Sequence, residues 1–231
     1  MTASAARSNG VSKIWPSPEG AVAGIAAGAT ILVGGFGDVG VPFALLAAVA
    51  LLGIGDLTIV SNNCGTGERG LALLFKQGLV RKVCASFPVQ AGNHHFKAAF
   101  DRGEVELELI PQGTIADRLR CAGAGLGGFY TRTGVGTELA GGRETRDMGG
   151  VAHLLELPLS GDVALVAAEV ADEAGNLRFR RSARNFNPIM AMAARLTIVQ
   201  ANKIVPVGAL DPDDIHLPGV FIDRVVDMSA Q

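Results

Sequence analysis

The residue spacing with the clearest chemical meaning is a glycine triad, Gly35-x-Gly37-x-x-Gly40, between a strand-like and a helix-like run. Glycines in such a turn let backbone N–H groups approach a phosphate at a helix N-terminus, where the helix dipole favours negative charge. A dinucleotide site also needs an acidic residue about 20 positions further on, to bind the ribose hydroxyls. The next strand-like run ends in Asn62 and Asn63 instead, which disfavours a nicotinamide or flavin dehydrogenase. A tight turn that binds no ligand stays open as the simpler interpretation.

The histidine, cysteine and glutamate residues show no spacing that would place two of them together as metal ligands or as a catalytic pair. His94 and His95 are adjacent, so their rings would diverge on a helix and would not share a metal ion. Cys64 follows a predicted strand, where a small buried residue is the commoner role. Glu106 and Glu108 alternate with apolar residues, as expected for the wet side of an exposed strand. We therefore expect no metal site.

The composition is that of a folded protein with a substantial core. Of the 231 residues, 48% are hydrophobic and 18% are charged, with a net charge of −2. This balance disfavours disorder and binding to nucleic acid or an anionic membrane. The basic residues between Arg178 and Arg184 are interpreted as a solvated face, with contact to a phosphate or to a partner chain as the alternative.

The cellular compartment is predicted from cysteine usage and hydropathy. The three cysteines are widely spaced and odd in number, which favours a reducing compartment. The first residues lack the apolar segment of a signal peptide. The longest apolar run, 41–54, is shorter than the roughly 20 residues that cross a bilayer, so we expect a cytoplasmic protein.

Strand-like and helix-like segments alternate along the chain. This predicts an α/β fold with an open, mostly parallel sheet and helices on both faces. The predicted strands are 30–33, 57–60, 80–86, 105–110, 153–157, 163–170 and 196–200, and the predicted helices are 18–27, 43–47, 68–77, 93–101, a segment from near Thr114, and 188–195. We expect a tail over residues 1–17 and a single domain over 18–231, with the glycine-rich 123–150 as a hinge or long loop.

Several short motifs occur in a fixed order along the chain. They are Gly34-Gly35-Phe36-Gly37 with Gly40-x-Pro42, Ser61-Asn62-Asn63, Pro111-Gln112-Gly113-Thr114, Gly123-Ala124-Gly125, Thr133-Gly134-x-Gly136-Thr137, and Ser182-Ala183-Arg184-Asn185-Phe186-Asn187. In this order they resemble the A subunit of family I coenzyme A transferases over residues 18–227. The expected fold is that of this family.

The resemblance implies covalent catalysis by a two-subunit enzyme. In this family a glutamate of the B subunit, within a Glu-Asn-Gly motif, attacks the thioester and passes through an anhydride to a glutamyl-CoA thioester, which gives ping-pong kinetics. No glutamate of this chain is followed by Asn-Gly. The chain is therefore expected to be active only with a B subunit, with the coenzyme A thioester as a substrate and no tightly bound cofactor.

Site roles for this chain also come from the resemblance. Gln112 follows a predicted strand and is assigned as the oxyanion donor, at the sheet edge where α/β sites form. Asn62 and Asn63 are assigned to orient the glutamate or the acyl carboxylate, although asparagine at a strand end is often only a turn former. The proposed coenzyme A loop consists of Gly34, Gly35, Phe36, Gly37, Asp38, Val39 and Gly40.

The expected substrate is a 3-oxo acid, with succinyl-CoA as the donor. The motifs at 86–88, 155–159 and 187–192 favour 3-oxoadipate, with acetoacetate next. Arg132 departs from the usual proline before Thr133-Gly134, which affects the acyl pocket more than the reaction. A non-catalytic small-molecule or nucleotide-binding module that uses the glycine loop stays open as an alternative, and sugar-phosphate isomerases have related folds.

Overall fold

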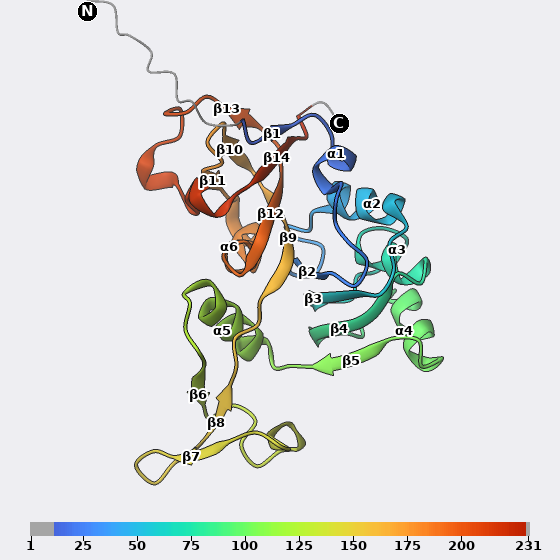
Figure 1. Ribbon diagram of the computed structural model, residues 1–231, viewed down its shortest axis with the longest axis vertical. Coiled ribbons are helices and arrows are strands. Elements are labelled where there is room, and N and C mark those ends of the chain that lie inside the picture. Colours follow the sequence, from blue (N-terminus) through green and yellow to red (C-terminus); the bar gives the residue numbers. More distant parts are fainter. Residues whose placement is uncertain (1–11, 230–231) are drawn as a thin grey trace, which may run out of the picture.

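A twisted sheet of eight parallel strands forms the centre of the protein (Figure 1). The computed structural model describes residues 12–229. In spatial order the strands are β1 (Ile14–Trp15), β14 (Arg224–Asp227), β12 (Ala194–Ala201), β9 (Gly161–Ala168), β2 (Thr30–Val33), β3 (Leu57–Asn63), β4 (Val80–Phe87) and β5 (Glu106–Leu109). Every pairing within this sheet is parallel. The predicted α/β fold with a parallel sheet is confirmed.

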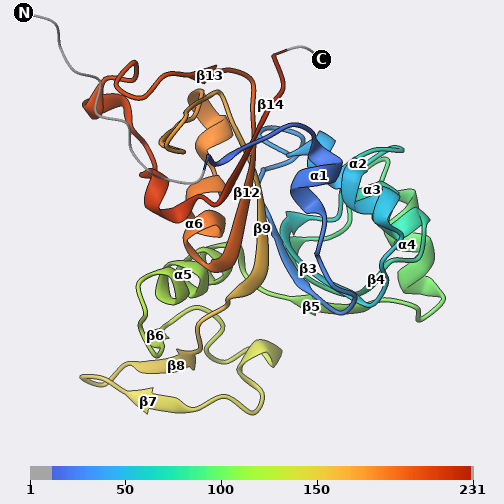
Figure 2. The same cartoon turned by 45° about the horizontal axis from the view of Figure 1, so that its top comes forward.

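Helices cover both faces of the sheet, as predicted (Figure 2). Four helices pack on one face: α1 (Pro18–Val22), α2 (Phe43–Leu52), α3 (Leu71–Lys76) and α4 (His94–Asp101). Two pack on the other face: α5 (Gln112–Gly123) and α6 (Asn187–Met192). Parallel strands joined by helical crossovers bury both faces of a sheet, which explains why the central strands β2 and β9 are almost continuously apolar.

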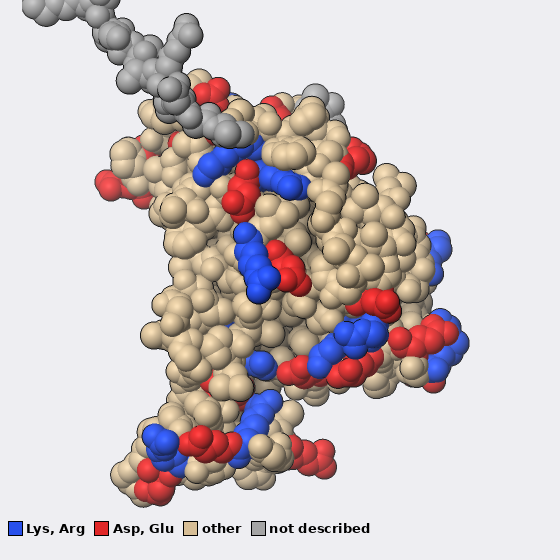
Figure 3. Space-filling model, in the orientation of Figure 1, with Lys and Arg blue, Asp and Glu red and all other residues tan. Residues whose placement is uncertain are grey.

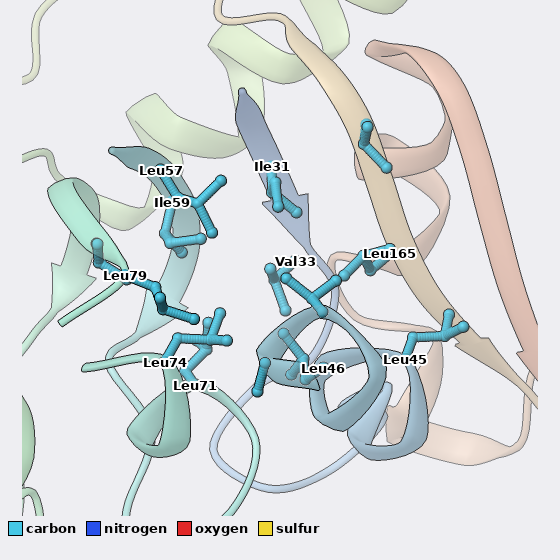
Figure 4. Packing of buried hydrophobic residues seen from close by; sticks show 14 of the residues in the cluster. Ile31, Val33, Leu45, Leu46, Leu57, Ile59, Leu71, Leu74, Leu79 and Leu165 are labelled. Atoms are coloured by element: carbon cyan, nitrogen blue, oxygen red, sulfur yellow. The ribbon is translucent and has the colours of Figure 1, made fainter. Parts of the chain in front are cut away.

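Successive residues of the central strands contribute to separate cores. Ile31 and Val33 of β2 belong to the cluster under α1–α4, whereas Leu32 belongs to the cluster under α5 and α6. This alternation follows from the two-residue side-chain period of a strand. Figure 4 shows the first cluster, with Leu45 and Leu46 of α2 pointing at the sheet.

A three-stranded antiparallel arm extends from the body, below α5 in Figure 1. The arm comprises residues 129–156, with β6 (Phe129–Thr131), η1 (Glu138–Ala140), β7 (Thr145–Asp147) and β8 (Ala152–Glu156). A second small sheet contains β10 (Val170–Asp172), β11 (Leu177–Arg178) and β13 (Ile204–Val205), and the remaining short helices are η2 (Arg181–Arg184), η3 (Pro212–Asp214) and η4 (Gly219–Phe221).

Arg118 of α5 connects the body to the base of the arm. Its Nε donates to Leu157 O at 2.8 Å, and its Nη1 lies 3.3 Å from Glu108 of β5. Glu156 of the arm is only 3% exposed and pairs with Arg143 and, at 3.9 Å, with Arg118. Opposite charges are also neighbours along the lower edge of the molecule in Figure 3.

Glu108 is expected to make the free energy of unfolding depend on pH. Burial raises its pKa, but the hydrogen bonds of Lys82 and Cys84 and the positive charges of Lys82 and Arg118 together outweigh burial, and the pKa falls below its usual value. A lowered pKa stabilises the fold above the unfolded-state value of 4.5, and that stability is lost as the pH falls through the folded-state pKa. Glu108→Gln should therefore reduce the acid-side loss of unfolding free energy, by less than about 1 kcal/mol because the carboxylate is partly exposed. Urea denaturation at neutral and acidic pH measures this, and parallel losses in the two proteins would contradict it.

Several boundaries differ from the sequence-based expectations; for example, α1 ends at Val22 and not at residue 27, and α2 extends to Leu52 and not only to residue 47. Ile14 and Trp15 of the expected tail pair with β14, whereas residues 1–11 lie outside the described residues. Segment 123–150 contains two strands of the arm and not only loop. Helix α5 begins at Gln112, two residues before the predicted start, because Pro111 with φ −54° precedes its first turn. We propose a single domain, as expected, but one that begins by Ile14 and not at residue 18, because β1 pairs with β14 in the central sheet.

Candidate functional site

A cavity of about 420 Å³ lies beside the carboxyl edge of the sheet, where the glycine loop, α5 and the start of α6 meet. Its lining residues are Phe36, Gln112, Gly113, Ala116, Asp117, Arg120, Asn185, Phe186 and Ile189. Three of the motifs that were separate in the sequence therefore contribute to one cavity. Carboxyl ends of parallel strands are the usual location of ligand sites in α/β folds.

Gln112 is the first residue of α5, and its side chain is exposed at the cavity. Strand β5 ends at Leu109, and Ile110 N still bonds to Ala85 O of the neighbouring strand, so the backbone before Gln112 is firmly held. The side-chain amide of Gln112 has no hydrogen-bond partner among the described residues. First-turn N–H groups and the positive end of the helix dipole lie at the same place, so an anion is favoured there.

Hydrogen bonds within the glycine loop, and to β9 and segment 182–187 beside it, hold the loop in place. Phe36 and Val39 exchange two backbone hydrogen bonds of 3.0 Å, Gly34 N donates to Leu165 O, and Gly35 N donates to the Asn185 side chain. Four N–H groups of the loop are thus already used inside the protein. This differs from a dinucleotide loop, whose N–H groups must be available to phosphate.

Two glycines of this loop, Gly34 and Gly40, are explained by close packing with segment 182–187. Gly40 has φ +74°, and a Cβ there would lie 2.7 Å from Ala183 O. Asn187 Nδ2 donates to Gly40 O at 3.0 Å and to Ala183 O at 2.9 Å, and Asn185 Nδ2 donates to Val39 O. The loop therefore needs glycine so that segment 182–187 can approach it.

Asn62 and Asn63 do not line the cavity. Both are buried at the end of β3, where Asn62 Nδ2 donates to Ser86 Oγ at 3.1 Å. Asn63 Nδ2 donates to Gly37 O at 3.3 Å, and its Oδ1 accepts from Gly65 N. The geometry brings Asn63 under the tip of the glycine loop, and direct substrate contact by either residue stays a prediction.

Sequence reasoning missed the helical stripe that continues from Gln112. Ala116 and Arg120 follow at intervals of four residues, with Asp117 beside them, and all face the cavity. Residues at i, i+4 and i+8 share one helix face, so this spacing was the available signal. The contribution of Phe186 and Ile189 had no such signal, because it depends on the packing of α6 against α5 on the same face of the sheet.

The cysteines are unsuited to nucleophilic catalysis. Cys64, Cys84 and Cys121 are free and buried. Burial raises the pKa of Cys64 far above its ordinary value and raises the pKa of Cys84 to about 12. A thiolate is the reactive form, so neither group is a competent nucleophile at neutral pH.

Metal ligands and membrane-spanning helices are both absent from residues 12–229. No three His, Cys, Asp or Glu side chains of this range converge as metal ligands. No helix in the same range combines the length and apolar character needed to cross a membrane.

The fold and cavity define the chain as an α/β protein with a ligand site at the sheet edge, and comparison with known proteins gives its family. The profile described as coenzyme A transferase matches residues 16–228. The chain is 48% identical over 220 residues to the A subunit of the 3-oxoadipate CoA-transferase of Pseudomonas putida, with 95% of each chain covered. It is also 48% identical to the A subunit of the probable succinyl-CoA:3-ketoacid coenzyme A transferase of Bacillus subtilis, covering 95% and 91%. The chain belongs to the coenzyme A transferase family, which uses acyl-CoA thioesters as substrates.

Solved structures show the same fold. The acyl-CoA transferase YdiF of Escherichia coli superimposes with a TM-score of 0.83 at 22% identity, over 95% of this chain and 48% of that chain. The glutaconate coenzyme A-transferase of Acidaminococcus fermentans gives 0.82 at 23% identity, over 93% and 75%. This chain spans about half the length of the YdiF chain.

Proposed function

We propose that this chain is the A subunit of a succinyl-CoA:3-oxoacid CoA-transferase whose acceptor is 3-oxoadipate or acetoacetate. Relatives with both substrate names are about equally similar, so both acids are retained. The observation that carries the proposal is the free amide of Gln112, at the N-terminus of α5 and at the mouth of the cavity. The free buried cysteines also support a reducing, cytoplasmic location.

The proposed nucleophile belongs to the B subunit. No glutamate is among the described residues that line the cavity, and the carboxylate that does line it, Asp117, is paired with Arg120. The partner's glutamate attacks the thioester carbonyl and releases CoA thiolate, leaving an acyl-glutamyl anhydride. The thiolate then attacks the glutamyl carbonyl of the anhydride and releases succinate, leaving a glutamyl-CoA thioester. The acceptor acid reverses these steps, which splits one difficult exchange into easier ones.

The proposed role of Gln112 is to stabilise the oxyanion that forms at each attacked carbonyl. Its amide N–H breaks no hydrogen bond within the protein when it donates to the oxyanion. The positive end of the α5 dipole also stabilises the negative charge of the oxyanion. The proposed coenzyme A contacts of the glycine loop involve the exposed Phe36 side chain and the loop tip at Gly37 and Asp38. Asn63 supports that tip through its bond to Gly37 O.

CoA transfer from succinyl-CoA tests the proposal. We expect activity with 3-oxoadipate or acetoacetate only when this chain and its B subunit are mixed, and none with either alone. Activity of this chain by itself would contradict the proposed division of the site, and inactivity of the mixture with every 3-oxo acid would contradict the proposed reaction.

A further inference from the structure

The cavity face of α5 contains a charged pair two turns beyond Gln112. Among the lining residues, Arg120 is the cation and Asp117 is the anion. Arg120 Nη1 lies 2.6 Å from Asp117 Oδ1, so the guanidinium extends back over the preceding turn, toward Gln112. Asp117 lies five positions after Gln112, which corresponds to about 7.5 Å along the helix axis.

A ligand carboxylate can replace Asp117 as the partner of Arg120. The side chains of Arg120 and Asp117 are 60% and 54% exposed, and an exposed ion pair contributes only about 0–1 kcal/mol. A carboxylate of a bound ligand therefore competes with Asp117 at little cost. Arginine also presents a planar set of N–H donors that matches a carboxylate in two-point contact.

The lining between the two ends suits a hydrocarbon chain. Phe36, Phe186, Ala116 and Ile189 supply apolar surface, and the charged groups of the lining are confined to Asp117 and Arg120. A molecule with a reacting carbonyl at one end, methylene groups in the middle and a second carboxylate at the other end matches this arrangement.

We propose that Arg120 determines specificity by binding the distal carboxylate of dicarboxylic acyl groups, with their reacting carbonyl at Gln112. The inference rests on the proposed function, because it takes Gln112 as the reacting end. Arg120 then favours a succinyl group and 3-oxoadipate over acids without a second carboxylate, and Asp117 holds the guanidinium in place between turnovers.

Ping-pong kinetics make the test sharp, because kcat/KM for the donor and for the acceptor report separate half-reactions. In the assembled enzyme, Arg120→Gln should lower kcat/KM for succinyl-CoA and 3-oxoadipate about 10- to 100-fold. The value for acetoacetate, which has no distal carboxylate, should stay close to that of the wild type. Asp117→Asn, which removes the competing carboxylate, should raise the dicarboxylate values about two- to fivefold.

Arg102→Gln is the matched control, since Arg102 makes an exposed ion pair with Glu104 at the end of α4, on the opposite face of the sheet. Equal losses for dicarboxylates and for acetoacetate in Arg120→Gln would overturn the proposal and indicate a structural role. Unchanged dicarboxylate values would overturn it as well.

A binding measurement separates this proposal from the proposed function. Adipate and hexanoate have the same length and differ in the distal carboxylate, so calorimetric titration compares them without turnover. Adipate should bind the wild-type complex more tightly than hexanoate, and Arg120→Gln should remove the difference. Should the enzyme transfer CoA to no acid, the proposed reaction fails, and equal adipate affinity in the wild type and Arg120→Gln would then overturn the role of Arg120 by itself.

Discussion

Replacement of Gln112 by alanine should lower turnover about 100-fold and leave the A–B complex assembled, because one oxyanion donor contributes about 10²–10³ in rate. The side chain is exposed and has no partner among the described residues, so its removal costs little in folding. Steady-state kinetics with succinyl-CoA, together with size-exclusion chromatography of the complex, measure both parts. The loss should fall mainly on kcat, since the amide acts where charge develops.

Two further variants define what the Gln112 result means. Gln112→Glu keeps the size of the side chain but places an acceptor where a donor is needed, so it should be at least as damaging as alanine. Gln77→Ala removes an exposed glutamine at the end of α3, on the opposite face, and should have wild-type kinetics. Wild-type turnover in Gln112→Ala would remove this residue from the site.

Replacement of Asn187 by alanine should lower the free energy of unfolding by about 2–4 kcal/mol. Asn187 is fully buried and bonds through its side chain to Gly40 O, Ala183 O and Ala167 N, at 3.0, 2.9 and 3.0 Å. Alanine leaves these backbone groups unpaired in a space closed to solvent, and an unpaired buried group loses its full hydration. Urea denaturation measures the change.

The same substitution should also impair catalysis, because Asn187 attaches the glycine loop to the start of α6. Asn202→Ala is the matched control, since Asn202 makes one exposed hydrogen bond, to Glu169. A loss of stability as small as that of the control would show that the loop does not depend on Asn187. Intact activity in a strongly destabilised protein would show that the loop position is unimportant for turnover.

The sheet was the most predictable part of the protein. Strand 30–33 was predicted with the bounds that β2 has, because a buried parallel strand is a continuous apolar run ended by glycine. Of the arm, only β8 was predicted, as strand 153–157. The other two arm strands, β6 and β7, have three residues each and no buried side chain, and they depend on pairing with β8, so neither periodicity nor hydropathy signals them.

The candidate site was predictable where a side chain follows a strand end, and unpredictable where it depends on distant contacts. Gln112 follows β5, and that position together with the family resemblance singled it out. Asn185 and Asn187 contact the glycine loop across about 150 positions of the chain, and no local pattern indicates that. Close packing with segment 182–187 requires glycine at positions 34 and 40, a reason that the spacing of the glycines did not indicate.

The location of the covalent intermediate tests the proposed division of the active site most directly. The assembled enzyme is incubated with succinyl-CoA without acceptor, and the two chains are then analysed separately by mass spectrometry. We predict a CoA thioester on a glutamate of the B subunit and none on this chain, with Gln112→Ala slowing its formation. A CoA adduct on any residue of this chain would contradict the proposed division.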